Sequence, residues 1–135
     1  MQQFILENDI HVLCVAARTF PAGIMEAFNK LHSIVPGAGE RDSYGISQGS
    51  KDGVIYKAAA QQLKEGEAEQ YGCEAFVIKK GTYTGTILKD WKKDEKAIGR
   101  TFRELLANPG IDPDGACIEK YMGDDVQCMI RLKDM

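Results

Sequence analysis

Glu119 stands in the middle of a stretch whose other residues favour a β-strand. Ile118 and Tyr121 are residue types that suit a pleated, half-buried surface, and glycines bracket the segment 115–123. A carboxylate in such a strand either points to water or points into a cavity, where a buried charge needs a partner. The residues by themselves leave both orientations open.

Strand alternation decides which neighbours share a face with Glu119. Tyr121 shares that face, whereas Ala116 and Ile118 belong to the other one. Small Ala116 and apolar Ile118 suit packing beneath a helix. We therefore expect Glu119 and Tyr121 to face a groove on the side of the sheet away from the helices.

Several aromatic residues could form the walls of a site around this carboxylate: Tyr44, Tyr56, Tyr83, Tyr121 and Trp91. Trp91 lies in a charged run, where it either anchors the start of a helix or supplies a cation–π face. Burial among rings would raise the pKa of Glu119, and a bound cation would lower it. Such a group suits trapping a cation or acting as a general base, and the sequence leaves both possibilities open.

The composition is that of an ordinary globular chain. Its 135 residues fit one domain, which we place at 1–135, with 44% hydrophobic and 27% charged residues. The net charge is −3 and the 17 basic residues are scattered, so we expect no direct contact with nucleic acid. No secretory signal is recognisable, and no apolar run approaches the ~20 residues that span a bilayer. We expect a cytoplasmic, soluble protein without membrane contact.

Cysteine and histidine usage argues against a metal centre. The four cysteines, Cys14, Cys73, Cys117 and Cys128, are far apart in sequence, so the paired spacing of a zinc site is missing. Each lies in an apolar, strand-like stretch, which favours buried free thiols. With two histidines in the chain, we expect no metal and no cofactor.

The first half of the chain reads as strand, helix, strand, strand. The stretch 11–19 is rich in β-forming residues, and a helix with one apolar face follows and ends at a Pro-Gly pair. The stretches 42–47 and 54–60 read as a hairpin with its turn near Asp52.

The same order returns in the second half. A strand over 73–88 precedes a helix with an apolar stripe, and a hairpin of 116–122 and 126–132 follows. This predicts tandem units at about 3–60 and 73–133 that pack in pseudo-twofold fashion, because neither can bury both faces of its own sheet. The expected fold class is α+β: an antiparallel sheet with helices on one side and a central ligand cleft.

Two polar stretches are interpreted as structural. The acidic stretch 65–69 is expected to be a solvated linker between the two units. The run 108–115 carries acidic side chains and glycines, but its spacing does not match a calcium-binding loop, so we expect a helix end followed by turns.

Two motifs resemble those of a known family. The Gly-x-Tyr of Gly81 and Tyr83 and the Glu-x-Tyr of Glu119 and Tyr121, in this order within a duplicated α+β unit, resemble the GyrI-like domain. It is also called the effector-binding domain of bacterial AraC-type and MerR-type transcription regulators. The resemblance covers almost the whole chain. It implies a central cleft that holds small, often flat and cationic organic molecules, with Glu119 as the charged anchor and the aromatic residues as walls.

The chain departs from the regulators of that family in one respect. The stretch 4–18 already reads as the first strand, so no helix-turn-helix precedes the domain and we expect a stand-alone form. Stand-alone relatives are similar to inhibitors of DNA gyrase or to hydrolases that open strained cyclopropane rings. Transcription regulation through direct DNA contacts is therefore not expected.

Three functions follow from this resemblance. The first is a binding domain of broad, multidrug-like specificity for cationic or amphipathic organic ligands. The second is a cyclopropane-ring hydrolase in which Glu119 activates water and Tyr83 or Tyr121 positions it. The third is a module that binds a protein partner, as in the gyrase inhibitors. Whether the protein is an enzyme stays open at this point.

Overall fold

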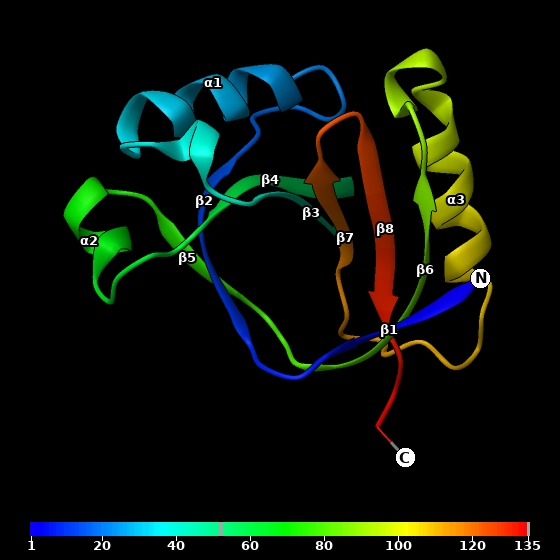
Figure 1. The fold of residues 1–135 in the computed structure, drawn as a ribbon. Coiled ribbons are helices and arrows are strands. Elements are labelled where there is room, and N and C mark those ends of the chain that lie inside the picture. Colours follow the sequence, from blue (N-terminus) through cyan, green and yellow to red (C-terminus); the bar gives the residue numbers. More distant parts are fainter. Residues whose placement is uncertain (52, 135) are drawn as a thin grey trace.

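The computed structural model describes residues 1–51 and 53–134 (Figure 1). Asp52, expected in the turn of the first hairpin, lies outside the described residues. The strands are β1 Gln2–Leu6, β2 Ile10–Ala16, β3 Ser43–Ser50, β4 Gly53–Gln61, β5 Glu74–Ile78, β6 Gly81–Leu88, β7 Cys117–Met122 and β8 Asp125–Arg131. The helices are α1 Ile24–Ile34, α2 Glu67–Tyr71 and α3 Lys96–Leu106, with the short 3₁₀ helices η1 Ala38–Glu40 and η2 Trp91–Lys93.

The strands form one antiparallel sheet in the order β1-β6-β8-β7-β3-β4-β2-β5. The sheet curls into a half-barrel, with α1 and α3 beside its strands (Figure 1). At its centre β3 of the first hairpin pairs with β7 of the second. The predicted α+β class with an antiparallel sheet is confirmed.

The predicted strand over 73–88 is wrong, because this segment forms two strands in different parts of the sheet. β5 pairs with β2, and β6 pairs with β1 and β8. The chain turns between them and enters β6 at Gly81, whose φ of +141° is a conformation that glycine adopts freely. A side chain at this position would also meet Arg131, whose Nε would lie 2.8 Å from an added Cβ. The β-forming residues on both sides of this break hid it from the sequence.

Helix α1 covers β2 and β4 through its apolar stripe. Ala27 and Leu31 pack against Leu13, Ala58 and Ala60. Because the alanine side chains of β4 are small, the helix backbone can approach the sheet closely. The spacing of apolar residues predicted this stripe, and the structure confirms it.

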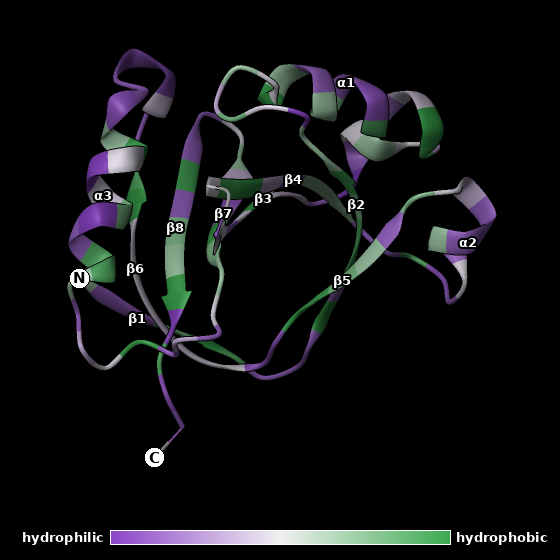
Figure 2. Ribbon diagram, turned by 180° about the vertical axis from the view of Figure 1, so that it is seen from behind, coloured by the Kyte–Doolittle hydropathy of each residue, from purple (hydrophilic) through white to green (hydrophobic). Residues whose placement is uncertain are grey.

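Helix α3 covers β6 and β8 in the same manner. Phe102 and Leu105 pack against Val126, Cys128 and Ile130. In Figure 2, both α1 and α3 carry hydrophobic and hydrophilic bands along their length, as expected for helices with one buried face. No helix within the described residues is long and apolar enough to cross a membrane.

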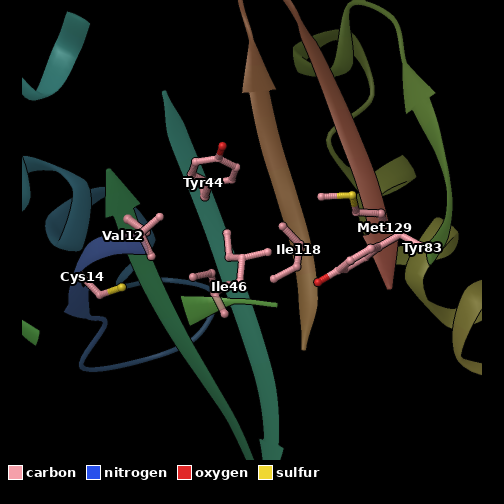
Figure 3. Packing of buried hydrophobic residues seen from close by; sticks show 9 residues of the cluster. Val12, Cys14, Tyr44, Ile46, Tyr83, Ile118 and Met129 are labelled. Carbon is pink, nitrogen blue, oxygen red and sulfur yellow. The ribbon is translucent and has the colours of Figure 1, made fainter. Parts of the chain in front are cut away.

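The other face of the sheet is filled by its own side chains. Because the sheet curls, side chains from distant strands meet there in one cluster (Figure 3), which includes Val12, Cys14, Tyr44, Ile46, Tyr83, Ile118 and Met129. These side chains are almost fully buried. Both faces of the sheet are therefore covered.

The acidic stretch 65–69 is not the solvated linker that its composition predicts. Residues Glu67–Tyr71 form α2, and Glu67 is only 2% exposed. The guanidinium of Arg41 donates hydrogen bonds of 2.9 Å to both carboxylate oxygens of Glu67. The backbone N–H groups of Leu63 and Lys64 donate to the same carboxylate. The charge is buried because a partner from a distant part of the chain neutralises it, and charge patterning in sequence does not show that partner.

Candidate functional site

A row of paired residues crosses the middle of the sheet between α1 and α3. Ala58 of β4 pairs with Gly45 of β3, and Gly45 pairs with Glu119 of β7. Glu119 in turn pairs with Cys128 of β8. Directly paired residues point to the same face of a sheet. Because Ala58 packs under α1 and Cys128 packs under α3, Glu119 points to the helix-bearing face between the two helices.

Glu119 thus lies on the opposite face from the expected one. Ile118, expected beneath a helix, packs with Ile46 and Met129 on the face opposite α1 and α3, which we call the curled face. Alternation separated the two sets of side chains correctly. It did not show which set faces the helices, because both faces of this sheet are buried and both accept apolar residues.

The carboxylate of Glu119 is buried and belongs to a chain of hydroxyl groups. Glu119 is 6% exposed. The hydroxyl of Tyr121 donates a hydrogen bond of 2.6 Å to its Oε1. The hydroxyl of Tyr56, which reaches over from β4, lies 3.4 Å from that of Tyr121. Two hydroxyls and one carboxylate therefore line up across the centre of the sheet.

Gly45 provides the room in which Tyr56 reaches this position. A Cβ at Gly45 would lie 2.2 Å from the Tyr56 hydroxyl oxygen. We expect Gly45→Ala to displace the ring of Tyr56 and to lower the free energy of unfolding by about 1 to 2 kcal/mol, measured by urea unfolding. Gly49→Ala in the same strand is the matched control, because a Cβ there meets no atom within 4 Å. Equal losses for the two variants would contradict this role of Gly45.

Aromatic rings from three further segments surround the two tyrosines. Phe20, in the loop before α1, stacks on Tyr56 with ring centroids 5.8 Å apart. Phe28 of α1 and Tyr121 pack edge to face, with ring centroids 5.8 Å apart. Trp91 of η2 lies 5.6 Å from Tyr121 on the side of α3. The carboxylate therefore sits beneath rings contributed by both halves of the chain.

Two features of these rings suit a binding site. Phe20 is 46% exposed, so it lies at the rim and not in the core. The indole Nε1 of Trp91 is buried and has no hydrogen-bond partner among the described residues. A buried donor without a partner costs free energy, and a bound water or ligand that accepts from this N–H would remove that cost.

The electrostatics of the site are those of an unpaired acid. Within residues 1–51 and 53–134, no lysine, arginine or histidine forms an ion pair with Glu119. Desolvation by burial raises the pKa of Glu119, and the hydrogen bond from Tyr121 opposes this rise only in part. Burial also raises the pKa of Tyr56 and of Tyr121, so both hydroxyls keep their protons.

The structure brings four of the six predicted site residues together: Glu119, Tyr121, Tyr56 and Trp91. It does not bring Tyr44 or Tyr83 to them, because both lie on the curled face (Figure 3). Tyr44 is adjacent to Gly45, which pairs with Glu119, so strand alternation points the Tyr44 side chain to the face opposite Glu119. The Tyr83 hydroxyl donates a hydrogen bond of 2.6 Å to the Lys79 carbonyl, and burial raises the pKa of Tyr83 to about 12.

Phe20 and Phe28 are site residues that the sequence patterns did not single out. Phe28 occurs at helix spacing, which predicts a place in the apolar face of α1 and not in a site. Phe20 lies beside Pro21 in a segment without periodicity. The available signal was weak: aromatic residues flank the start of α1, and Phe28 lies at the edge of the apolar stripe.

The thiols and acids of the described residues do not form a metal site. No group of three or more histidine, cysteine, aspartate or glutamate residues in residues 1–51 and 53–134 is placed to hold a metal ion. The four cysteines are free. Burial raises the pKa of Cys117 to about 11 and that of Cys128 to about 12, so the two thiols beside Glu119 are poor nucleophiles.

The fold is shared with solved proteins, whereas the sequence has no close match. No protein-family model matches the chain, and no curated protein sequence matches it. The fold, a curled antiparallel sheet with two helices on one face, recurs in solved structures at low identity. The likeness therefore shows the fold, and it fits the GyrI-like fold that the sequence motifs resemble.

Two solved structures illustrate the likeness. A hydrolase from Listeria innocua superposes with a TM-score of 0.65 at 10% identity, covering 98% of this chain and 90% of its own. The protein SAV2435, solved bound to tetraphenylphosphonium, superposes with a TM-score of 0.62 at 8% identity, covering 96% of this chain and 93% of its own.

Proposed function

We propose that the protein binds lipophilic organic cations in the site between α1 and α3. The charged anchor is Glu119, and the walls are the rings around it: Phe20, Phe28, Tyr56, Trp91 and Tyr121. In this proposal the chain is a stand-alone binding domain that resembles the effector-binding domains of transcription regulators. The single observation that supports it most is a buried carboxylate that lies beneath aromatic rings and has no cationic partner in the described part of the chain.

The proposed ligand class follows from the contrast between the acidic group of Glu119 and the neutral, aromatic side chains around it. A buried anion is costly unless it is paired, and the described residues offer it one neutral hydroxyl. Aromatic faces attract cations and repel anions, because the ring face is negative. A ligand with a positive charge and an apolar body satisfies both the carboxylate and the rings, and no polar pattern in the walls restricts its identity.

The solved neighbour SAV2435 supports this ligand class, since its structure contains tetraphenylphosphonium, a large apolar cation. In the present chain the rings pack on one another above Glu119. We therefore expect Phe20, the half-exposed ring at the rim, to move aside when a ligand enters.

The test is a calorimetric titration with tetraphenylphosphonium. We expect binding by the wild-type protein and at least tenfold weaker binding by Glu119→Gln, which corresponds to about 1.4 kcal/mol or more. Glutamine keeps the shape and the acceptor of the hydrogen bond from Tyr121 but removes the charge. Triphenylphosphine oxide, a neutral molecule of similar apolar character, should bind both proteins equally.

The matched control is Glu104→Gln on the exposed side of α3, which changes the net charge by the same amount. Its affinity for tetraphenylphosphonium should equal that of the wild type. Equal affinity of Glu119→Gln and the wild type for this cation would remove the anchor role from Glu119.

A hydrolase is the second candidate, and the hydroxyl chain favours it. A carboxyl group with a raised pKa beside an oriented hydroxyl suits proton transfer. As a carboxylate, Glu119 would take a proton from a water whose oxygen attacks a cyclopropane carbon. The electron pair of the breaking carbon–carbon bond would remain on the substrate, which would then take up the proton that Glu119 received, so that one water is added in total. Tyr121 replaces Tyr83 as the positioning hydroxyl, because Tyr83 lies on the other face.

The two candidates differ in what happens to the ligand. A binder returns its ligand chemically unchanged, whereas a hydrolase consumes a strained electrophile and loses turnover in Glu119→Gln. Mass spectrometry of a cyclopropane-containing electrophile after incubation with the protein decides between them.

A further inference from the structure

Within residues 1–51 and 53–134, two carboxylates are buried, and their hydrogen-bond partners differ in charge. Glu67 receives two hydrogen bonds from the Arg41 guanidinium and two from backbone N–H groups. Glu119 is nearly as buried, and among the described residues it receives a single hydrogen bond, from the neutral hydroxyl of Tyr121. A buried carboxyl without a countercharge avoids the cost of burial by keeping its proton.

The groups that face Glu119 from the sheet are neutral. On its own strand these are Tyr121 and Cys117, and from β8 the directly paired residue is Cys128. Tyr56 reaches over from β4, and Gly45 on β3 carries no side chain. None of these groups supplies a positive charge.

The helical segments packed against the site add no countercharge either. They present the rings of Phe28 and Trp91. Charged residues on the same segments have other positions: Glu26 of α1 pairs with Arg18 in solvent, and the Lys92 ammonium lies 5.8 Å from the centroid of the Trp91 ring.

We propose that Glu119 is protonated in the empty site and that an organic cation binds in exchange for this proton. The inference rests on the cation-binding function proposed above and adds its regulation by pH. On binding, the O–H bond of the Glu119 carboxyl breaks, the proton passes to the buffer, and the carboxylate pairs with the cation. Tyr121 then donates its hydrogen bond to a full anion, which strengthens that bond.

Proton exchange makes affinity depend on pH in a defined direction. While Glu119 is protonated in the empty protein, a cation must displace the proton, so affinity rises about tenfold per pH unit. Once the empty site is ionised, affinity becomes constant. The raised pKa of Glu119 extends the rising part of this curve above the range of an ordinary glutamate. The site would thus hold cations in a neutral or alkaline medium and release them on acidification.

The test uses tetraphenylphosphonium, whose charge does not change with pH, so any pH dependence belongs to the protein. Calorimetry at one pH in two buffers of different ionisation enthalpy gives the number of protons released. We expect this number to be largest at the acidic end of the pH range and to fall toward zero at high pH, as affinity rises to its constant level.

Two variants separate proton exchange from a merely structural effect. In Glu119→Gln, residual binding should release no proton and should not vary with pH. In Tyr121→Phe, the carboxylate loses the hydrogen bond from Tyr121, so the proton is held more tightly and the rising part of the affinity curve should extend to higher pH. An unchanged curve in Tyr121→Phe would contradict the proposed control of the proton by Tyr121.

Infrared spectroscopy tests the proton directly. The empty wild-type protein should show the C=O stretch of a protonated carboxyl near neutral pH; the band should disappear on addition of tetraphenylphosphonium and be absent in Glu119→Gln. Cation binding with no proton release and no such band would overturn the exchange. If the cation does not bind at any pH, the proposed function fails, and the band in the empty protein still decides whether Glu119 holds a proton.

Discussion

Replacing Arg41 with methionine is expected to lower the free energy of unfolding by about 3 to 5 kcal/mol, because the change leaves the buried Glu67 carboxylate without its countercharge. The side chains of the pair are 6% and 3% exposed, so water does not substitute for the lost guanidinium. Arg41 also donates a hydrogen bond to the Gln61 carbonyl at the end of β4, which the variant leaves without this donor. Thermal unfolding should shift downward by roughly 10 °C or more.

The pH dependence of stability identifies the cause of this loss. The hydrogen bonds from Arg41 and from the Leu63 and Lys64 N–H groups lower the pKa of Glu67 from 4.5 to about 2. A carboxyl whose pKa is lower in the folded state stabilises the protein above its unfolded pKa, and this contribution is lost as pH falls through the folded value. The stability of the wild type should therefore approach that of Glu67→Gln between about pH 4.5 and pH 2, as measured by urea unfolding.

An exposed ion pair provides the control for this prediction. Arg18 and Glu26 also form an ion pair, but their side chains are 84% and 66% exposed. Glu26→Gln should change stability by less than about 0.5 kcal/mol. The double variant Arg41→Met/Glu67→Gln should lose less than the sum of the single variants, because the partners are coupled. Additive losses would show that the two residues stabilise the fold independently.

Local patterns predicted the parts of this fold that local physics determines. The helix spacing of Leu31 and its neighbours, and of Phe102 and Leu105, fixed the buried faces of α1 and α3. The two hairpins followed from β-forming runs separated by turns. These signals are local because each element's own periodicity sets which side is buried.

The remaining features depend on contacts between distant segments. The segment 73–88 has β-forming residues throughout, so its division into β5 and β6 becomes visible only when each strand has its own partner. The sequence around Glu67 predicts an exposed side chain, and its burial is explained only by the contact with Arg41 in the folded chain. The predicted face of Glu119 was wrong for a related reason, since the curl of the sheet also buries the side that lacks α1 and α3.

Strand alternation predicts which tyrosines lie beside Glu119 only within the strand that carries Glu119. Tyr121 shares the face of Glu119 by its position two residues further on, and this neighbourhood is visible in sequence. Tyr56 and Tyr44 belong to other strands, and their relation to Glu119 depends on register. The pairing of Gly45 with Glu119 excludes Tyr44, and the pairing of Ser47 with Tyr56 and with Cys117 places Tyr56 on the site's face.

Replacing Glu119 with methionine is expected to raise the free energy of unfolding near pH 8 by about 2 to 4 kcal/mol. Methionine has a similar length and packs well against aromatic rings. The pKa of Glu119 is raised above 4.5 in the folded protein, so the folded state binds the proton more tightly than the unfolded state. The stability that this proton provides is present below about pH 4.5 and is lost as pH rises through the folded pKa.

The advantage of Glu119→Met should therefore grow with rising pH, the opposite of the behaviour expected for Glu67. Urea unfolding of both proteins from about pH 4 to pH 8 measures this difference, and Glu104→Met on the exposed side of α3 should show none. A variant less stable than the wild type at pH 8 would mean that Glu119 stabilises the fold. A gain at pH 8 together with the loss of cation binding would mean that the fold keeps a destabilising acid at its centre because the ligand needs it.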